Sequence, residues 1–101
     1  MSIVKVNAIQ VPRERATEFE ERFLARAGQV AKAEGFEAFE LLRPLEGERY
    51  LVYARWASEE AFQGWMKSNA FQQGHRAHQA GGPVGTSSEL WGFEVIQSEY
   101  V

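Results

Sequence analysis

Hydrophobic and polar residues alternate with the period of a β-strand in four stretches of the chain. The first stretch covers residues 3–11 and is rich in β-branched side chains, which favour strands. In such a strand the even-numbered residues from Val4 to Ala8 share one face, and the odd-numbered residues from Ile3 to Ile9 share the other. The same alternation predicts three further strands, over residues 36–43, 50–56 and 89–96. A β-sheet is therefore the expected centre of the fold.

The residues between the first two predicted strands place hydrophobic side chains every three or four positions, which is the spacing of an amphipathic helix. Phe19, Phe23 and Val30 belong to this pattern, which predicts a helix from residue 13 to about residue 33. Pro12 suits the first turn of a helix because its φ angle is fixed, and Gly35 suits the region where a helix ends.

A second helix is predicted after the third strand. Ser58 is a favourable N-cap, and the acidic residues that follow it interact well with the positive end of the helix dipole. Phe62 and Trp65 then lie three residues apart on one face of the helix. A short helix over residues 70 to about 78 and a flexible glycine-rich loop over residues 81–85 are expected to lead to the last strand.

The order of these elements predicts the fold. Strand, helix, strand, strand, helix, short helix, strand is the order of the ferredoxin-like, or split βαβ, arrangement, an α+β fold with helices on one face of a single antiparallel sheet. The length indicates one domain over residues 1–101. The second face of the sheet, or the core, is expected to hold Tyr53, Trp91, Phe93 and Val95. A second copy of the chain, in a two-fold dimer, would cover that face and protect the strand edges.

Composition and charge narrow the classes of function. The formal net charge of −3 and the pI of about 5.4 argue against a protein that binds a nucleic-acid backbone. The absence of Cys excludes disulfides, thiolate catalysis and Cys-based metal sites. The start of the chain lacks the apolar segment of a signal peptide and no apolar run is long enough to span a membrane, so a soluble cytoplasmic protein is expected.

His75 is the first candidate for chemistry, because the chain contains neither a phosphate-binding loop nor the spacing of a zinc site. A neutral imidazole binds iron or zinc, and a single His holds the iron in many haem proteins. A lone His at a helix end is more often solvated or a cap. Here Phe71 and Gly74 leave room for a flat ligand to approach, and His78 is the competing candidate. Two His without Cys argue against a closed zinc site.

Asn7 and Trp65 are the next candidates. Amides are depleted in strands, so Asn7 either bonds to neighbouring backbone or faces solvent, or it donates a hydrogen bond to a ligand or a developing oxyanion. Trp65 is either a core residue or the wall of an aromatic pocket shared with Phe23 and Phe62.

Arg22 and Arg26 lie four residues apart on the first predicted helix. Glu18 precedes Arg22 by four residues, so a solvated face with ion pairs is the ordinary explanation. The alternative is recognition of ligand carboxylates, for which a planar guanidinium is well suited.

Several stretches of the chain together resemble a known family. They are VKVNAI near the start, RFLARA, LLRPLEGERYLVYARW, SEEAFQGW, and GHRAH around residue 75. In this order and spacing they resemble the antibiotic biosynthesis monooxygenase superfamily, and within it the IsdG-type haem-degrading monooxygenases and their mycobacterial branch. The resemblance covers nearly the whole chain. It implies a dimeric α/β barrel with one haem site in each subunit.

The resemblance also implies roles for individual residues. His75 would be the proximal ligand of the haem iron, Asn7 a hydrogen-bond donor on the distal side, and Trp65 a wall that presses on the porphyrin and ruffles it. Haem would be both cofactor and substrate, oxidised at a meso carbon to a bilin-type product with electrons from an external reductase. Further residues of the haem site would be Arg22, Phe23, Arg26, Phe62 and Phe71.

Two other functions stay open. One is a cofactor-independent monooxygenase of the same superfamily, acting on a polycyclic phenol or quinol with an amide to stabilise an oxyanion. The other is a haem-binding protein without turnover. The product class also stays open, because the spacing from Trp65 to His75 fits the staphylococcal type and is one residue longer than the mycobacterial pattern.

Overall fold

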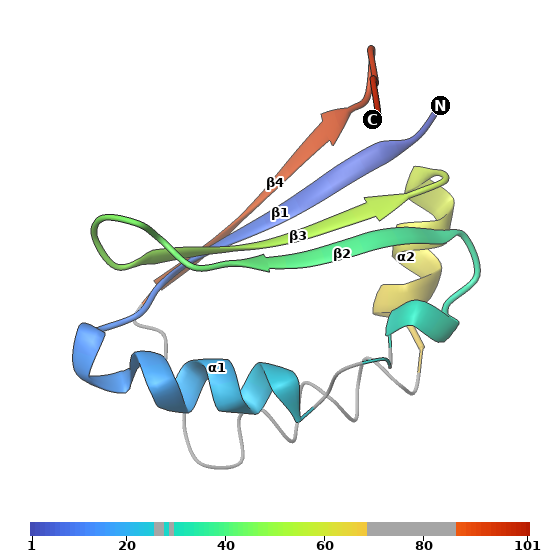
Figure 1. Cartoon of the computed structure of the whole chain (residues 1–101). Helices are drawn as coiled ribbons and strands as arrows, with labels where there is room; N and C mark the ends of the chain where they lie inside the picture. The colour runs from blue at the N-terminus through green and yellow to red at the C-terminus, as the bar shows by residue number, and fades with distance from the viewer. Residues whose placement is uncertain (26–27, 29, 69–86) are drawn as a thin grey trace.

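The computed structural model describes residues 1–25, 28, 30–68 and 87–101, and its core is one four-stranded sheet with the strand order β2-β3-β1-β4 (Figure 1). Every neighbouring pair of strands is antiparallel. The elements, in chain order, are β1 (Ile3–Gln10), the 3-10 helix η1 (Arg13–Arg15), α1 (Ala16–Leu24), the 3-10 helix η2 (Val30–Lys32), β2 (Phe36–Leu42), β3 (Arg49–Trp56), α2 (Glu59–Met66) and β4 (Ser87–Glu94). The chain therefore has the predicted ferredoxin-like α+β fold, and the four predicted strands are confirmed.

The register of the sheet fixes which residues share a face. On β1, Asn7 lies between Val52 of β3 and Leu90 of β4. The odd-numbered residues of β1 face the helices, because Ile9 packs against the core of α1 and Lys5 contacts Phe62 of α2. We call this the inner face, and the opposite side of the sheet the open face. The alternation predicted that Asn7 shares a face with Ile3, Lys5 and Ile9, and the structure shows that the helices cover this face.

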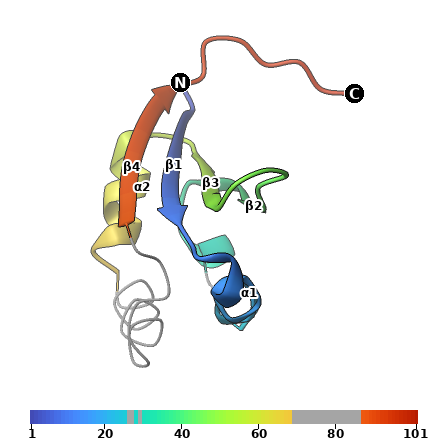
Figure 2. The same cartoon turned by 90° about the vertical axis from the view of Figure 1, so that its left-hand side faces the viewer.

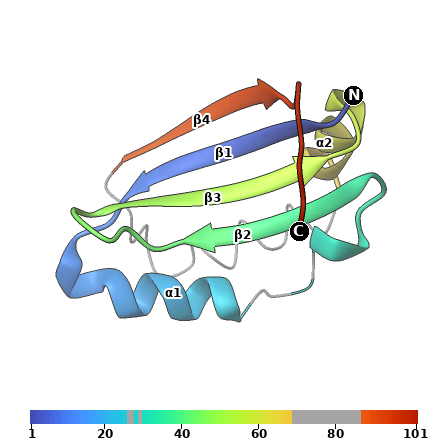
Figure 3. The ribbon, with the colours of Figure 1, turned by 45° about the horizontal axis from the view of Figure 1, so that its top comes forward.

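The two helices pack at opposite ends of the inner face (Figures 1 and 3). At the α1 end, Phe19 is fully buried, with its ring centroid 4.9 Å from that of Tyr50 and Val11 beside them. At the α2 end, Trp56 is 1% exposed and its ring meets that of Phe62 at 6.0 Å. Each fully buried side chain of this size stabilises the fold by about 1.5–3 kcal/mol. The core is therefore divided between two aromatic clusters.

The first helix is shorter than predicted, and the prediction of a helix to about residue 33 was wrong. The segment begins with the 3-10 turn η1, and α1 ends at Leu24 with Ala25 as its C-cap. Gly28 then has a φ of +89°, a left-handed conformation that breaks a helix and that glycine adopts without penalty. Gly35, at a φ of +80°, lies as predicted at the end of this region.

The second helix begins as predicted. The Ser58 side chain accepts a hydrogen bond from the Ala61 amide at 3.1 Å, which satisfies one of the free N–H groups of the first turn. The predicted short helix over residues 70–78 and the loop over residues 81–85 lie outside the described residues. In the part of the chain that the structure does describe, no helix has the length and apolar character needed to cross a membrane.

The open face is only partly covered. Val4 and Val6 are buried between the neighbouring strands, and Phe93, which pairs with Val4, is 53% exposed. After β4 the chain crosses this face as an extended tail (Figures 2 and 3). Arg55 Nη1 donates a hydrogen bond to the Tyr100 hydroxyl, and its guanidinium lies 5.9 Å from the centre of the Tyr100 ring. Of the residues predicted for this face or the core, those in strands lie on the open face: Tyr53, Trp91 and Phe93.

Candidate functional site

The candidate site is the part of the inner face that lies between α1 and α2. Asn7 is at its centre, and it is only partly buried. The residue opposite it on β4, Leu90, is 56% exposed, and Phe39 of β2, on the same face, is 40% exposed. An apolar surface with a single carboxamide in it suits a flat, largely apolar ligand.

The Asn7 carboxamide has no hydrogen-bond partner among the residues that the structure describes. Its two strand neighbours, Val52 and Leu90, are both apolar. A polar group in such surroundings costs free energy unless it is paired. Of the three explanations left open by the sequence, a bond to neighbouring backbone is not observed among the described residues, and the partly exposed amide is accessible to solvent or to a ligand.

Trp65 lies in the last turn of α2 and belongs to the aromatic cluster at that end of the sheet. Its ring centroid is 6.4 Å from that of Trp56, with 31° between the ring planes. It also lines a hollow of about 620 Å³ between α2 and residues 32–35. Trp56 lies four residues beyond Val52, the partner of Asn7, so Trp56 and Asn7 are about 13 Å apart along the strand direction.

Phe23 and Phe62, predicted to form one aromatic wall with Trp65, belong to different clusters. The ring of Phe23 contacts that of Phe19 on α1, with centroids 4.9 Å apart. Phe62 contacts Trp56, next to Trp65. The rings lie in different clusters because the helices that carry them pack at opposite ends of the sheet, and a pocket shared by all three stays a prediction. A ligand between the helices would meet one aromatic cluster on each side.

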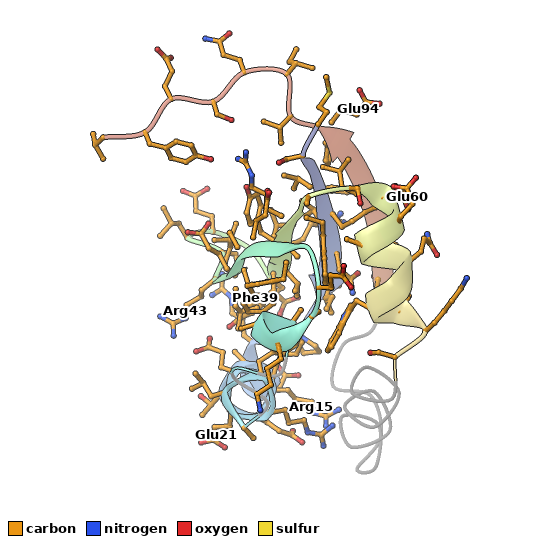
Figure 4. The ribbon with its side chains drawn as sticks, turned by 90° about the vertical axis from the view of Figure 1, so that its right-hand side faces the viewer. Arg15, Glu21, Phe39, Arg43, Glu60 and Glu94 are labelled. Atoms are coloured by element: carbon orange, nitrogen blue, oxygen red, sulfur yellow. The ribbon has the colours of Figure 1, made fainter. Side chains whose placement is uncertain are left out.

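Arg22 has the ion pair that its spacing predicted. Its Nη2 atom lies 2.9 Å from Glu18 Oε2, and Arg15 Nη2 lies 3.0 Å from the other oxygen of the same carboxylate. Two guanidinium groups thus bind the same carboxylate on α1. In Figure 4, Arg15 and Glu21 project from different sides of α1.

A second cluster fixes α1 to the sheet. Glu20 accepts hydrogen bonds from Arg43, with 2.8 Å between Nε and Oε2, and from the hydroxyl of the buried Tyr50. These bonds, the one from Arg43 first, lower the pKa of Glu20 to about 2 from a usual value of 4.5. The carboxylate therefore stays charged, and α1 holds Arg22 and Phe23 in place over the sheet.

Three predicted site residues lie outside the described residues: Arg26, Phe71 and His75. The competing candidate His78 also lies there. Their placement relative to Asn7 and Trp65 stays a prediction. Within the described ranges, no group of three or more His, Cys, Asp or Glu side chains could hold a metal ion.

Two residues near the site were missed by the sequence reasoning. Trp56 is the buried ring against which both Phe62 and Trp65 pack, and its Nε1 atom is buried without a hydrogen-bond partner in the described structure. Lys5 lies on the same face as Asn7, and its ammonium group forms an ion pair with Glu59 of α2. The alternation of β1 already placed Lys5 on that face, so a charged residue among apolar ones was the available signal.

Comparison with known proteins identifies relatives that span nearly the whole chain. The family model of antibiotic biosynthesis monooxygenases matches residues 2–77. A haem oxygenase (mycobilin-producing) from Mycobacterium tuberculosis is 46% identical over 99 residues, which cover 95% of this chain and 90% of the relative. A haem-degrading monooxygenase from Bacillus mycoides is 32% identical over 84 residues, which cover 80% of this chain and 77% of the relative.

Solved structures give the same result. A crystal structure of an MhuD variant with two manganese protoporphyrin IX molecules bound per active site superposes with a TM-score of 0.87, at 42% identity, and covers 98% of this chain and 99% of that one. SnoaB, a cofactor-independent oxygenase from Streptomyces nogalater, has a TM-score of 0.77 at 26% identity, with 96% of this chain and 95% of that one covered. The fold, the family model and the identity to both relatives lead to one conclusion: the chain belongs to the antibiotic biosynthesis monooxygenase family.

Proposed function

We propose that the chain is a haem-degrading monooxygenase, which cleaves haem oxidatively to a bilin-type product and releases the iron. The observation that carries this proposal is the 46% identity to a mycobilin-producing haem oxygenase over 95% of the chain. The site geometry supports it, because a partly exposed apolar surface between two aromatic clusters suits a porphyrin.

Each of the family's three residues has a proposed role. His75 would hold the iron, and Asn7, whose carboxamide has no partner among the described residues, would donate a hydrogen bond in the haem pocket. Trp65, on α2, would press on the porphyrin and ruffle it. Haem supplies the iron centre at which oxygen is activated, and an external reductase supplies electrons. The residues proposed to line the site are Arg22, Phe23, Arg26, Phe62 and Phe71.

The assembly and the setting are part of the proposal. The open face carries Tyr53, Trp91 and Phe93 beside the buried Val4 and Val6. An apolar sheet face of this kind supports a homodimer in which two open faces meet. A cytoplasmic location stays the prediction made from the sequence.

A second function is supported by a specific observation. SnoaB, a cofactor-independent oxygenase, has the same fold over 96% of this chain at 26% identity. In such an enzyme Asn7 would stabilise an oxyanion on a polycyclic phenol or quinol, and no iron ligand would be needed. A haem-binding protein without turnover is the third alternative. It differs from the first only in that it does not cleave the bound haem.

A titration with hemin separates the three functions. Haem degradation requires a Soret band on addition of hemin and the loss of that band with ascorbate or a reductase under oxygen. A band that persists under these conditions indicates binding without turnover. No band at micromolar protein contradicts both haem functions and favours the cofactor-independent oxygenase.

Two His variants in the same assay test the proposed ligand. His75→Ala is expected to abolish tight axial ligation, and His78→Ala to leave the Soret band nearly unchanged. The reverse result would assign the iron to His78.

A further inference from the structure

Lys5 links the sheet to α2 at a place that none of the proposed catalytic roles uses. It lies on the inner face of β1, two residues before Asn7. Its side chain is only 18% exposed, although it carries a charge. A charge held this close to an apolar sheet requires a partner, and the arrangement around it shows how the partner is provided.

Small neighbours on both adjacent strands make room for this side chain. Lys5 pairs with Ala54 on β3 and with Gly92 on β4. A Cβ atom on Gly92 would come within 3.0 Å of Lys5 Nζ, 3.6 Å of its Cδ and 3.7 Å of its Cε. The lysine therefore lies across Gly92, and a side chain at that position would displace it.

The ammonium group contacts α2 at two points. Lys5 Nζ is 2.9 Å from Glu59 Oε1 and 4.8 Å from the centre of the Phe62 ring. Glu59 and Phe62 are three residues apart, on one face of the helix. The second oxygen of Glu59 accepts a hydrogen bond from Gln63 Nε2 at 2.8 Å, so the carboxylate is held on both sides. Two contacts with one face fix how α2 is rotated and where it lies along β1.

These contacts affect the position of α2 more than they affect the free energy of unfolding. Glu59 is 48% exposed, and an ion pair with a half-exposed carboxylate adds little to the free energy of unfolding. However, α2 has only eight residues, too few to form a stable helix alone, so its place is set by what it touches. On the sheet its Phe62 and Trp65 rings meet Trp56 at an edge-on and a tilted angle, and its Glu59 forms a directed ion pair with Lys5.

We propose that Lys5 is a positioning residue, which holds α2 so that Trp65 lies at a fixed place relative to Asn7. Trp65 follows Phe62 by one turn of α2, and Asn7 follows Lys5 on the same face of β1. The lysine thus connects the two elements that carry both groups. This inference rests on the proposed function, because a fixed Trp65 matters for pressing on a bound porphyrin.

The test compares Lys5→Met, which keeps the stem and removes the charge, with Lys5→Arg, which keeps the charge. In the hemin-loaded chain, Lys5→Met is expected to change hemin affinity by less than about threefold and to lower kcat about tenfold, because small misplacements of positioning groups act mainly on rate. The NMR shifts of the haem methyl groups, which report distortion of the porphyrin, are expected to move toward those of Trp65→Ala. Lys5→Arg should restore both readouts.

Control variants separate this role from a general loss of charge. Glu59→Gln is expected to reproduce the effect of Lys5→Met. Glu60→Gln, the same change one residue on, should have none, because Glu60 projects away from the sheet (Figure 4). Adding Lys5→Met to Trp65→Ala should lower kcat no further. Wild-type haem methyl shifts and kcat in Lys5→Met would overturn the proposal.

A readout in the haem-free chain keeps the inference separate from the proposed function. Amide hydrogen exchange in residues 62–66 is expected to be about tenfold faster in Lys5→Met and at the wild-type rate in Lys5→Arg, since local opening follows the loss of tertiary contacts. If the wild-type chain binds no hemin, the proposed function fails, and this exchange experiment alone decides whether Lys5 holds α2. Unchanged exchange would overturn that role.

Discussion

Asn7 is the residue whose surroundings differ most from what its side chain requires. Its carboxamide lies between Val52 and Leu90 and has no hydrogen-bond partner in the described part of the chain. An unpaired amide in an apolar setting lowers stability by about 1–3 kcal/mol if it is fully buried, and by less when it is partly exposed. We propose that the amide is paired in the complex with the substrate, which would offset this cost.

Asn7→Ala is therefore expected to keep the fold and the ferric Soret band, to unfold at a slightly higher temperature, and to degrade haem about a hundredfold more slowly. The rate estimate assumes that one hydrogen bond made mainly in the transition state contributes about 3 kcal/mol. Single-turnover decay of the Soret band measures it. Ser88→Ala, which removes an exposed polar group from the same face, should behave as wild type. If the Soret band of Asn7→Ala decays at the wild-type rate, the amide has a structural role and no role in turnover.

The sequence predicted which residues of β1 share a face with Asn7, but not which side of the sheet the helices cover or what lies beside Asn7 on the neighbouring strands. The face follows from alternation, a local property that the chain carries in every short segment. The neighbours Val52 and Leu90 follow from the register between strands far apart in the chain. The contact of Trp65 with Trp56 was missed for the same reason, because it depends on where α2 packs. Local sequence patterns thus predicted individual site residues. Which of these residues contact one another depends on the pairing of strands and the packing of helices that are distant in sequence.

At the level of elements, the close contact between the start of β2 and α2 depends on Gly35. A Cβ atom on Gly35 would come within 2.4 Å of the Cβ atom of Ala61, and the residue has a φ of +80°. Both the clash and the left-handed backbone require glycine there. The sequence suggested Gly35 as the end of a helical region, but the packing role is visible only in the fold. The wrong length of α1 has a related cause, since Gly28 breaks the helix although the hydrophobic pattern continues to Val30.

Gly35→Ala is expected to lower the free energy of unfolding by about 2–5 kcal/mol, of which the left-handed backbone accounts for about 1–2 and overpacking for about 1–3. Gly47→Ala is the matched control, because its φ is +83° but nothing lies within 4 Å of an added Cβ atom. Urea unfolding should show a loss of only about 1–2 kcal/mol for the control. Equal losses in the two variants would show that Ala61 moves aside without cost.

The contact of α1 with the sheet predicts that the free energy of unfolding depends on pH. The pKa of Glu20 is lowered to about 2 by the hydrogen bonds from Arg43 and Tyr50, so this carboxylate stabilises the fold fully above pH 4.5 and loses that contribution as the pH falls toward 2. Glu20→Gln should cost about 1 kcal/mol at pH 7, since a neutral acceptor binds Arg43 less strongly. The difference from wild type should shrink below pH 4.5. Urea unfolding at pH 7 and pH 3 measures it, and a difference that persists unchanged at pH 3 would contradict the assignment.

For the whole molecule, the open face predicts association. Phe93 is 53% exposed there, beside Tyr53 and Trp91, and a chain of 101 residues rarely leaves such a face in water. Light scattering at micromolar concentration is expected to give twice the chain mass of 11.5 kDa. Phe93→Glu should shift the equilibrium toward the monomer. Leu45→Glu should not, because Leu45 is fully exposed at the tip of the β2–β3 loop, outside this face. A wild-type monomer would contradict the proposed dimer.

The C-terminal tail has a practical consequence for how the chain should be studied. Because Arg55 holds Tyr100 over the open face, anything fused after Val101 starts above that face instead of out in bulk solvent. An affinity tag or fluorescent fusion at this end would be present at high local concentration where a partner subunit docks, and it would weaken the measured association. Fusions at Met1, which is 80% exposed, avoid the Tyr100 contact, so comparing tags at the two ends reveals how much of an apparent monomer is caused by the label.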